Sequence, residues 1–151
     1  MLVALLAALG AILATYLTLY KLGYIGQLAC AIGSCERVQT SRWSVLFGIP
    51  VAGWGVGYYL LVLVVAVAGT QESLADSRAM SSALVALTAW GVIFSSYLTY
   101  LELFVIRGIC EYCVSSAILV TLMFGVAVSD ARRRAEEPSS RAAGTEQPNT
   151  H

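Results

Sequence analysis

Four long stretches of apolar residues set the strongest limit on how this chain can fold. They cover about residues 2–22, 50–69, 81–106 and 109–129. Each approaches the roughly 20 apolar residues that an α-helix needs to cross a membrane. The whole chain is 58% hydrophobic and only 12% charged, whereas soluble domains carry about 25% charged residues. The sequence therefore predicts an all-α integral membrane protein built as a four-helix transmembrane bundle.

The first apolar stretch can also be compared with a cleaved signal peptide. No basic residue precedes it, and it is longer than the apolar region of about 7–15 residues in such a peptide. We therefore expect an uncleaved spanning helix. Small residues let membrane helices approach closely, and the first stretch carries Ala4, Ala7, Ala8, Ala11 and Ala14. We expect Gly53, Gly55 and Gly57 in the second stretch to serve packing in the same way.

A change in composition after residue 129 divides the chain in two. We expect residues 1–129 to form one membrane domain, and residues 130–151, rich in Arg, Glu, Ser, Pro and Gly, to form a disordered cytoplasmic tail. Because Arg132–Arg134 directly follow the last span, both termini are predicted on the cytoplasmic side of the cytoplasmic (inner) membrane. The Gly23–Ile49 loop and the Arg107–Gly108 break then face the outer, periplasmic side. A net charge of zero gives no support to nucleic-acid binding, which needs a basic face.

The four cysteines are all predicted at or near the outer face. They are Cys30, Cys35, Cys110 and Cys113, and in a bacterium the outer compartment is oxidising. Cys110 and Cys113 form a CxxC at the start of the fourth helix, where a spacing of three puts both sulfurs on one face. The helix N-terminus favours a thiolate there, and Arg107 is expected to act in the same direction. This arrangement indicates reactive thiols.

Cys30 and Cys35 bracket the turn-prone sequence Ala-Ile-Gly-Ser, which allows their Cα atoms to approach bonding distance. A ring this small stabilises by roughly 2 kcal/mol, against about 4–5 kcal/mol for a crosslink that closes about 80 residues. Such a disulfide is easily reduced, as a shuttle requires. A structural zinc site, two inert disulfides or ordinary buried cysteines are the alternatives. Zinc is disfavoured because there is no second CxxC, so we expect no metal.

Two further features lie between these cysteines. Within Arg37–Pro50, apolar residues recur at spacings of three and four at Trp43, Leu46, Phe47 and Pro50. This predicts a short amphipathic helix at the membrane interface, lying over a site that opens to the lipid. A re-entrant loop that leads into the second span is the alternative. Glu102, near the outer end of the third span, is expected to be an interfacial carboxylate, although a buried carboxylate would indicate a proton pathway.

Several motifs together resemble the vitamin K epoxide reductase family. They are Cys-x-Arg-Val-x-x-Ser-Arg-Trp from Cys35 to Trp43, Phe47-Gly48, the CxxC, and the stretch from Ser96 to Phe104. The resemblance covers nearly all of residues 10–125. It implies that Cys110 and Cys113 are the active-site pair, with Cys113 nearest a bound quinone. It also implies that Cys35 exchanges with Cys110 and that Cys30 meets an external thiol partner.

The resemblance implies a quinone of the menaquinone, ubiquinone or phylloquinone type, taken up from the membrane lipid. Ser41 matches a serine that positions the loop and the quinone, and the other candidate quinone contacts are Trp43, Phe47, Ser115 and Ser116. Ala117 and a position near Val51 depart from the tyrosine and asparagine of the vertebrate enzymes, so those two polar contacts are missing.

The expected function is a membrane thiol–disulfide oxidoreductase that passes electrons to a quinone and supports disulfide-bond formation. Bacterial members of the family often carry a fused thioredoxin-like domain, which does not fit within 151 residues. A separate periplasmic thioredoxin-fold partner is therefore expected, while no particular oligomeric state is predicted. The alternatives are a vitamin K epoxide or quinone reductase and, in another class, a structural membrane protein with inert disulfides.

Overall fold

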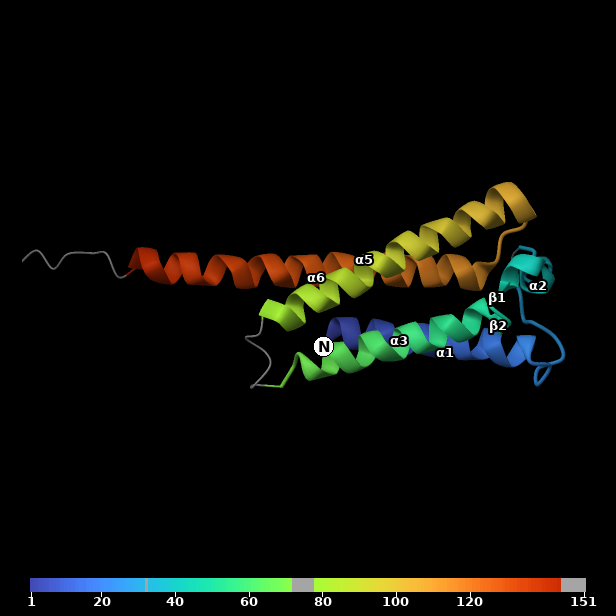
Figure 1. The fold of residues 1–151 in the computed structure, drawn as a ribbon, viewed down its shortest axis with the longest axis horizontal. Coiled ribbons are helices and arrows are strands. Elements are labelled where there is room, and N and C mark those ends of the chain that lie inside the picture. The colour runs from blue at the N-terminus through green and yellow to red at the C-terminus, as the bar shows by residue number, and fades with distance from the viewer. Residues whose placement is uncertain (32, 72–77, 145–151) are drawn as a thin grey trace, which may run out of the picture.

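A computed structural model describes the backbone of residues 1–31, 33–71 and 78–144. Four helical spans are long and apolar enough to cross a membrane, namely Leu2–Lys21, Val51–Ala68, Ala79–Ile106 and Glu111–Glu136. They fall in the helices α1 (Leu2–Lys21), α3 (Val51–Ala68), α5 (Arg78–Tyr100) and α6 (Glu111–Gly144), which run alongside one another (Figure 1). The third span continues past α5 to Ile106. The predicted four-helix membrane bundle is confirmed, with boundaries close to those expected.

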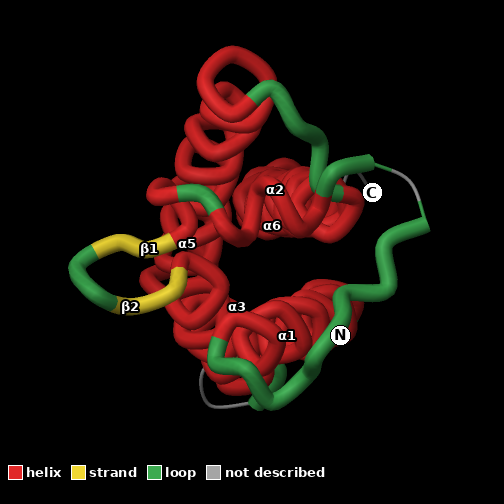
Figure 2. The backbone as a smooth tube through the Cα atoms, turned by 90° about the vertical axis from the view of Figure 1, so that its right-hand side faces the viewer, coloured by secondary structure: helices red, strands yellow, loops and turns green. Residues whose placement is uncertain are grey.

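The bundle consists of two helix pairs, α1 with α3 and α5 with α6, and α1 also packs against α6 (Figure 2). Small residues of α1 make the close approach possible. Ala7 is fully buried, and a Cβ atom added at Gly10 would collide with the ring of Tyr59 on α3. The predicted packing role of the alanines in this helix is confirmed at Ala4, Ala7 and Ala14, which lie in the core.

Between α1 and α3 the chain builds a small cap at one end of the bundle (Figure 1). It contains α2 (Cys35–Thr40), a single 3₁₀ turn (Arg42–Ser44), and the antiparallel strands β1 (Val45–Leu46) and β2 (Ile49–Pro50). In this hairpin Val45 pairs with Pro50, and Leu46 pairs with Ile49.

The prediction of an amphipathic helix from Arg37 to Pro50 is therefore wrong for most of its length, because α2 ends at Thr40. The helix ends because Ser41 is extended, with φ −66° and ψ 155°, and further along Phe47 and Gly48 have φ angles of 53° and 81°. Consecutive residues with positive φ fit a tight hairpin turn and cannot continue a right-handed helix. An interfacial position for this cap stays a prediction.

The connection between α5 and α6 also lies at the cap end. A π-helical segment, η2 (Leu101–Ile106), extends α5. Arg107 then takes the left-handed conformation with φ 53°, and the N–H of Gly108 donates to the carbonyl of Glu102 at 3.0 Å. The predicted break at Arg107–Gly108 is confirmed, and it turns the chain directly into α6.

At the far end of the bundle, α6 continues past Asp130 as far as Gly144. The prediction of a disordered tail from residue 130 is therefore wrong for residues 130–144, and residues 145–151 lie outside the described part of the chain. Ala, Arg and Glu are good helix formers, and Arg134 Nε donates to Asp130 Oδ2 at 2.9 Å, one turn away. Local preference thus carries the helix beyond its apolar segment.

Candidate redox and quinone site

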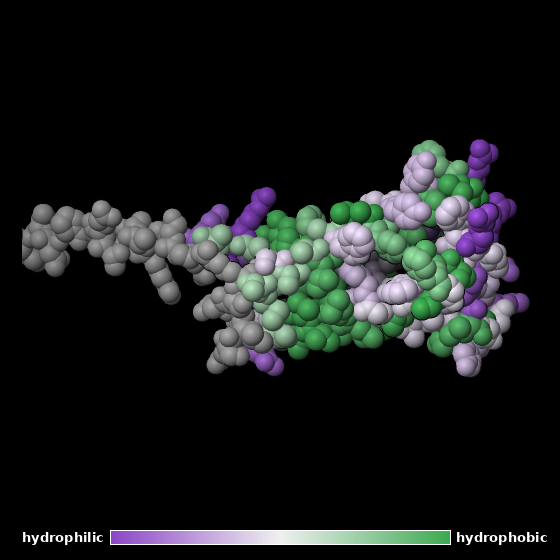
Figure 3. All heavy atoms as spheres, viewed as in Figure 1, coloured by the Kyte–Doolittle hydropathy of each residue, from purple (hydrophilic) through white to green (hydrophobic). Residues whose placement is uncertain are grey.

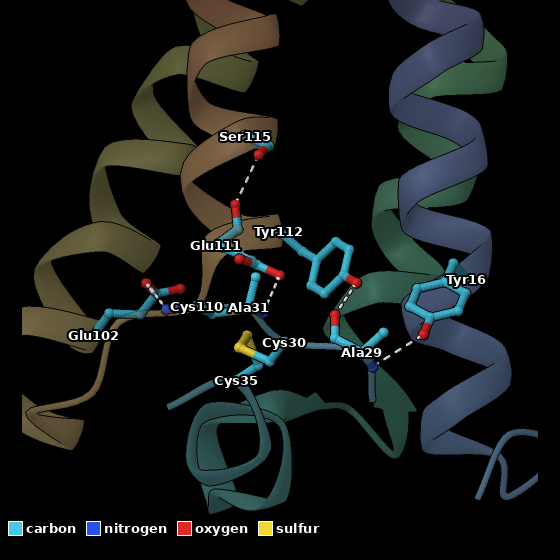
Figure 4. The surroundings of a disulfide bond; sticks show 10 residues. All are labelled: Tyr16, Ala29, Cys30, Ala31, Cys35, Glu102, Cys110, Glu111, Tyr112 and Ser115. Atoms are coloured by element: carbon cyan, nitrogen blue, oxygen red, sulfur yellow. Dashed lines mark hydrogen bonds between the residues drawn. A yellow bond between two sulfur atoms is a disulfide. The ribbon is translucent and has the colours of Figure 1, made fainter. Parts of the chain in front are cut away.

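The four cysteines gather at the cap end of the bundle. Cys30 and Cys35 form a disulfide with Cα atoms 6.2 Å apart, whereas Cys110 and Cys113 are free thiols. Cys35 is the first residue of α2, Cys110 immediately precedes α6, and Cys113 lies in the first turn of α6. The disulfide lies next to the start of α6 (Figure 4).

One buried cluster contains a cysteine of each pair. Cys35 is 1% exposed and Cys110 is 0% exposed, and they share this cluster with Val38. Cys30, Cys113 and three other partly buried residues, Leu28, Ile106 and Tyr112, pack around it. Two cysteines 75 positions apart in the chain therefore lie in one buried cluster, and an exchange between the two pairs requires such proximity.

Backbone contacts hold the cysteine loop against the start of α6. The N–H of Ser34 donates to the carbonyl of Ile109 at 2.8 Å, and Gly33 forms an antiparallel bridge with Cys110. Gly33 has φ 107°, a conformation that L-residues rarely adopt. A Cβ atom there would also collide with the carbonyl oxygen of Ile109. Only glycine fits this position.

We expect Gly33→Ala to detach the loop from α6. The positive φ alone costs about 1–3 kcal/mol, and the collision with Ile109 adds to that cost, so the contact between Cys35 and Cys110 is weakened. The measurement is the rate at which a Cys35–Cys110 crosslink forms when Cys113 is replaced by alanine, with Gly26→Ala as the matched loop control. Gly26 has open space around its Cβ position. Equal rates in the two variants would rule out this docking role.

The two residues between Cys110 and Cys113 hold the same loop through their side chains. Glu111 Oε1 accepts the N–H of Ala31 at 3.1 Å, and the hydroxyl of Tyr112 donates to the carbonyl of Ala29 (Figure 4). Tyr16 of α1 accepts the N–H of Ala29 at 3.2 Å. The x positions of the CxxC therefore fix the loop that carries the other cysteine pair. The sequence analysis did not find this role.

The Cys30, Cys35 and Glu111 ligand atoms lie within 4.8 Å of one another. Three such groups resemble a partial metal site, but a metal binds the thiolate form of cysteine, and these two sulfurs are bonded to each other. In this state the arrangement places a carboxylate beside a disulfide.

Local electrostatics lower the pKa of the Cys110 thiol from 9.0 to about 7, mainly through a hydrogen bond from the Cys113 thiol. Burial opposes this shift, while the backbone N–H groups of Tyr112 and Cys113 support it, and the charge of Glu102 opposes it. The predicted effect of the helix N-terminus is therefore present, whereas the predicted help from Arg107 is replaced by that of Cys113. At neutral pH a substantial fraction of Cys110 is the reactive thiolate.

Beneath the cap lies a cavity of about 680 Å³ with mostly apolar walls, bounded by all four long helices. Figure 3 shows a hollow in this part of the bundle. Cys113 lies on its wall, and so do four of the five residues proposed from sequence to contact a quinone, namely Ser41, Trp43, Phe47 and Ser116.

Ser115 is the exception among these candidates. It does not belong to the cavity wall, and its hydroxyl donates to the carbonyl of Glu111 at 2.8 Å. Successive residues of a helix point about 100° apart, so Ser115 and Ser116 face different sides. The packing role predicted for Gly57 is not observed. The space around its Cβ position is open, and the residue lines the cavity instead of packing against a helix.

Sequence analysis also did not predict the hydrogen bonds that join α1 to the cap. Lys21 Nζ donates to the carbonyl of Gln39 and to Ser44 Oγ, the latter at 2.8 Å. Gln39 is itself 6% exposed and lies on the cavity wall. A lone lysine at the end of a spanning helix gave no signal for this role, because such residues usually reach into water.

Glu102 is 4% exposed, so the expectation of an interfacial carboxylate is wrong. Its Oε2 accepts the N–H of Cys110 at 3.4 Å, and the residue lies on the cavity wall. The π-helical turn of η2 directs this side chain toward the start of α6.

Two cysteine pairs that share a buried cluster at one end of a four-helix membrane bundle, with Cys113 on the wall of an apolar cavity, indicate a membrane oxidoreductase. The family model of the vitamin K epoxide reductase family matches residues 1–128. The chain therefore belongs to the vitamin K epoxide reductase family, as its motifs indicated.

Proposed function

We propose that the protein is a quinone-dependent thiol–disulfide oxidoreductase that supports disulfide-bond formation. Electrons would come from a separate periplasmic thioredoxin-fold dithiol protein, pass through Cys30 and Cys35 to Cys110 and Cys113, and leave on a quinone. One observation carries the proposal: Cys35 and Cys110 share a buried cluster, while Cys113 lies on the wall of the apolar cavity.

The first exchange takes place at the loop disulfide. Cys30 is half-buried whereas Cys35 is 1% exposed, so a partner thiolate reaches the sulfur of Cys30. Attack there forms a partner–Cys30 disulfide and releases Cys35 as a thiolate. The second partner thiol then displaces Cys30, which leaves the partner oxidised and the loop as a dithiol.

The second exchange joins the two pairs. The Cys35 thiolate attacks Cys110 of an oxidised Cys110–Cys113 pair and releases the Cys113 thiolate. Cys30 then attacks Cys35, which restores the loop disulfide and frees Cys110. The lowered pKa of Cys110, about 7, makes it a good leaving group in this step. A loop disulfide beside two free thiols, as observed here, is the product of this exchange.

The residues present fit a quinone. The cavity volume of about 680 Å³ lies within the range of roughly 300–1,000 Å³ found for small-molecule sites. Its apolar walls suit a lipid-soluble ring. On the cap side these walls include Ser41, Trp43 and Phe47. The hydroxyl of Ser116 is 2.6 Å from that of Tyr59, so Ser116 is already engaged. When bound, the quinone supplies an acceptor for two electrons and two protons.

The proposed orientation places the cysteine end outside the cytoplasmic membrane. Arg132–Arg134 lie in the second half of α6, away from the cap at its start, and the positive-inside rule favours the cytoplasm for such a cluster. Both chain termini would then be cytoplasmic.

A single-turnover assay in lipid nanodiscs tests the proposal. The full-length protein is reduced, freed of reductant, and mixed with decylubiquinone or a short-chain menaquinone. We expect one quinol for each pair of alkylatable thiols that is lost, and no quinol from the Cys110→Ala/Cys113→Ala double variant. Cysteines that resist reduction, or thiols that persist beside both quinones, would contradict the proposal and favour disulfides that only brace the loops.

A further inference from the structure

Glu102 is the one charged residue of the span Ala79–Ile106. It is 4% exposed and lies in the π-helical segment η2. A buried carboxylate in a membrane is costly and usually has a functional role, and π-helical turns often occur at functional sites. Neither exchange between the cysteine pairs described above uses this group.

Glu102 lies between the reactive thiols and the cavity. Its Oε2 accepts the N–H of Cys110 at 3.4 Å, and its side chain lies within hydrogen-bonding reach of the Cys113 thiol, whose single proton can turn to Cys110 or to Glu102. Glu102 and Cys113 both lie on the cavity wall. The carboxyl group can therefore reach a proton on Cys113 and a molecule in the cavity.

Two hydroxyl groups on the cavity wall already donate to backbone carbonyl groups. Tyr58 donates to the carbonyl of Leu87 at 3.1 Å, and Ser41 donates to that of Val38 at 2.7 Å. Among the described residues that line the cavity, Glu102 is the one carboxyl group. It is thus the wall group best suited to gain and lose a proton near neutral pH.

We propose that Glu102 is a catalytic proton carrier, which takes the proton of the Cys113 thiol and delivers it to a quinone oxygen in the cavity. The inference rests on the proposed quinone reduction and adds a residue to it. It requires a contact between Glu102 and the reacting sulfur, which the hydrogen bond to Cys113 supplies.

The reaction balances as follows. Cys110 and Cys113 together lose two electrons and two protons when their sulfurs bond, and the quinone gains two electrons and two protons as it becomes the quinol. Glu102 removes the Cys113 proton, which gives the thiolate that donates electrons, and returns this proton to the quinone. Cys110 releases its proton to water, and the second proton of the quinol is taken up from water. Glu102 ends each turnover in its starting state.

Glu102→Gln separates this role from a structural one. The amide oxygen of glutamine still accepts the N–H of Cys110, but the side chain no longer carries a proton. With the quinone that the wild-type protein reduces in nanodiscs, we expect the variant to reduce it about 100-fold more slowly or worse, in line with the loss of a general acid–base group. Glu102→Asp is expected to recover at least about tenfold of this loss. Glu36→Gln, at an exposed carboxylate beside Cys35, is the matched control.

A second readout needs no quinone. The infrared S–H stretching band of Cys113, assigned by its absence in Cys113→Ala, is expected to shift to higher frequency in Glu102→Gln, because a neutral amide accepts a weaker hydrogen bond than a carboxylate. An unchanged band, or Glu102→Gln turnover within about threefold of wild type, would overturn the inference.

Failure of the role of Glu102 and failure of the proposed function give different results. If wild-type protein reduces quinone and Glu102→Gln does so equally well, only the role of Glu102 is lost. If the wild-type dithiol leaves every quinone unreduced, the proposed function fails and the inference fails with it. Should Glu102→Gln not fold, Glu102→Asp decides, because activity that does not exceed the Cys113→Ala background in a folded Asp variant contradicts proton transfer by a carboxyl group.

Discussion

Replacing Cys113 with alanine is expected to reduce quinone turnover to the uncatalysed background and to leave Cys35 joined to Cys110. Cys113 is the thiol on the cavity wall, so without it no sulfur reaches the quinone. Cys110 still lies in the buried cluster with Cys35. Oxidation of a partly reduced protein therefore joins these two sulfurs, and no Cys113 thiol remains to attack Cys110. Replacing Cys30 as well removes the thiol that would attack Cys35, so the crosslink accumulates most in the Cys30→Ala/Cys113→Ala variant.

A non-reducing gel and peptide mapping of the linked cysteines provide the measurement. Val114→Ala is the control, because Val114 is the adjacent residue on α6 and is 39% exposed. We expect this control to keep its turnover and to accumulate no crosslink. Undiminished turnover in Cys113→Ala would remove the role proposed for this residue, and a crosslink through Cys30 would reverse the roles of the two loop cysteines.

Gly57→Phe is expected to lower kcat/KM for the quinone by about 100-fold or more, equivalent to about 2.7 kcal/mol. Gly57 lines the cavity and has no atom within 4 Å of its Cβ position, so a phenyl ring can enter the space that the quinone needs. The exchange between Cys35 and Cys110 takes place outside this space and should continue at its normal rate.

Gly125→Phe controls for the added bulk. Gly125 also has open space around its Cβ position, but it is exposed on α6 and does not line the cavity. Steady-state quinone reduction is measured for both variants, and crosslink formation is measured in a Cys113→Ala background. Equal kcat/KM values for the two variants would show that the quinone binds elsewhere.

The helical framework could be predicted because its signals are local. Runs of apolar residues define the spans, and Arg107-Gly108 marks the turn before α6. The hairpin was missed because Trp43, Leu46 and Phe47 follow a helical spacing, while the positive φ of Phe47 comes from the turn geometry of the folded cap. Beyond Asp130, helix-forming residues outweigh the polar composition that suggested disorder.

The site could be predicted only in part, because spacing places cysteines on a helix but does not say what they touch. The contacts of Glu111 with Ala31 and of Tyr112 with Ala29 join residues about 80 positions apart. Such contacts arise from tertiary packing and leave no periodic signal. Glu102 was misplaced for a related reason, since the depth of a carboxyl group near a helix end depends on the rotation of that helix.

The most direct test of the account follows all four thiols of the fully reduced wild-type protein after mixing with a short-chain quinone. Samples are quenched with an alkylating reagent at successive times, and each cysteine is quantified by peptide mass. We predict that Cys110 and Cys113 lose their free thiols first and that Cys30 and Cys35 follow as electrons pass inward. Two results would contradict a relay between the pairs. One is loss of the Cys30 and Cys35 thiols before those of Cys110 and Cys113. The other is oxidation of the loop pair at a rate that is unrelated to that of the CxxC pair and that Cys113→Ala leaves unchanged.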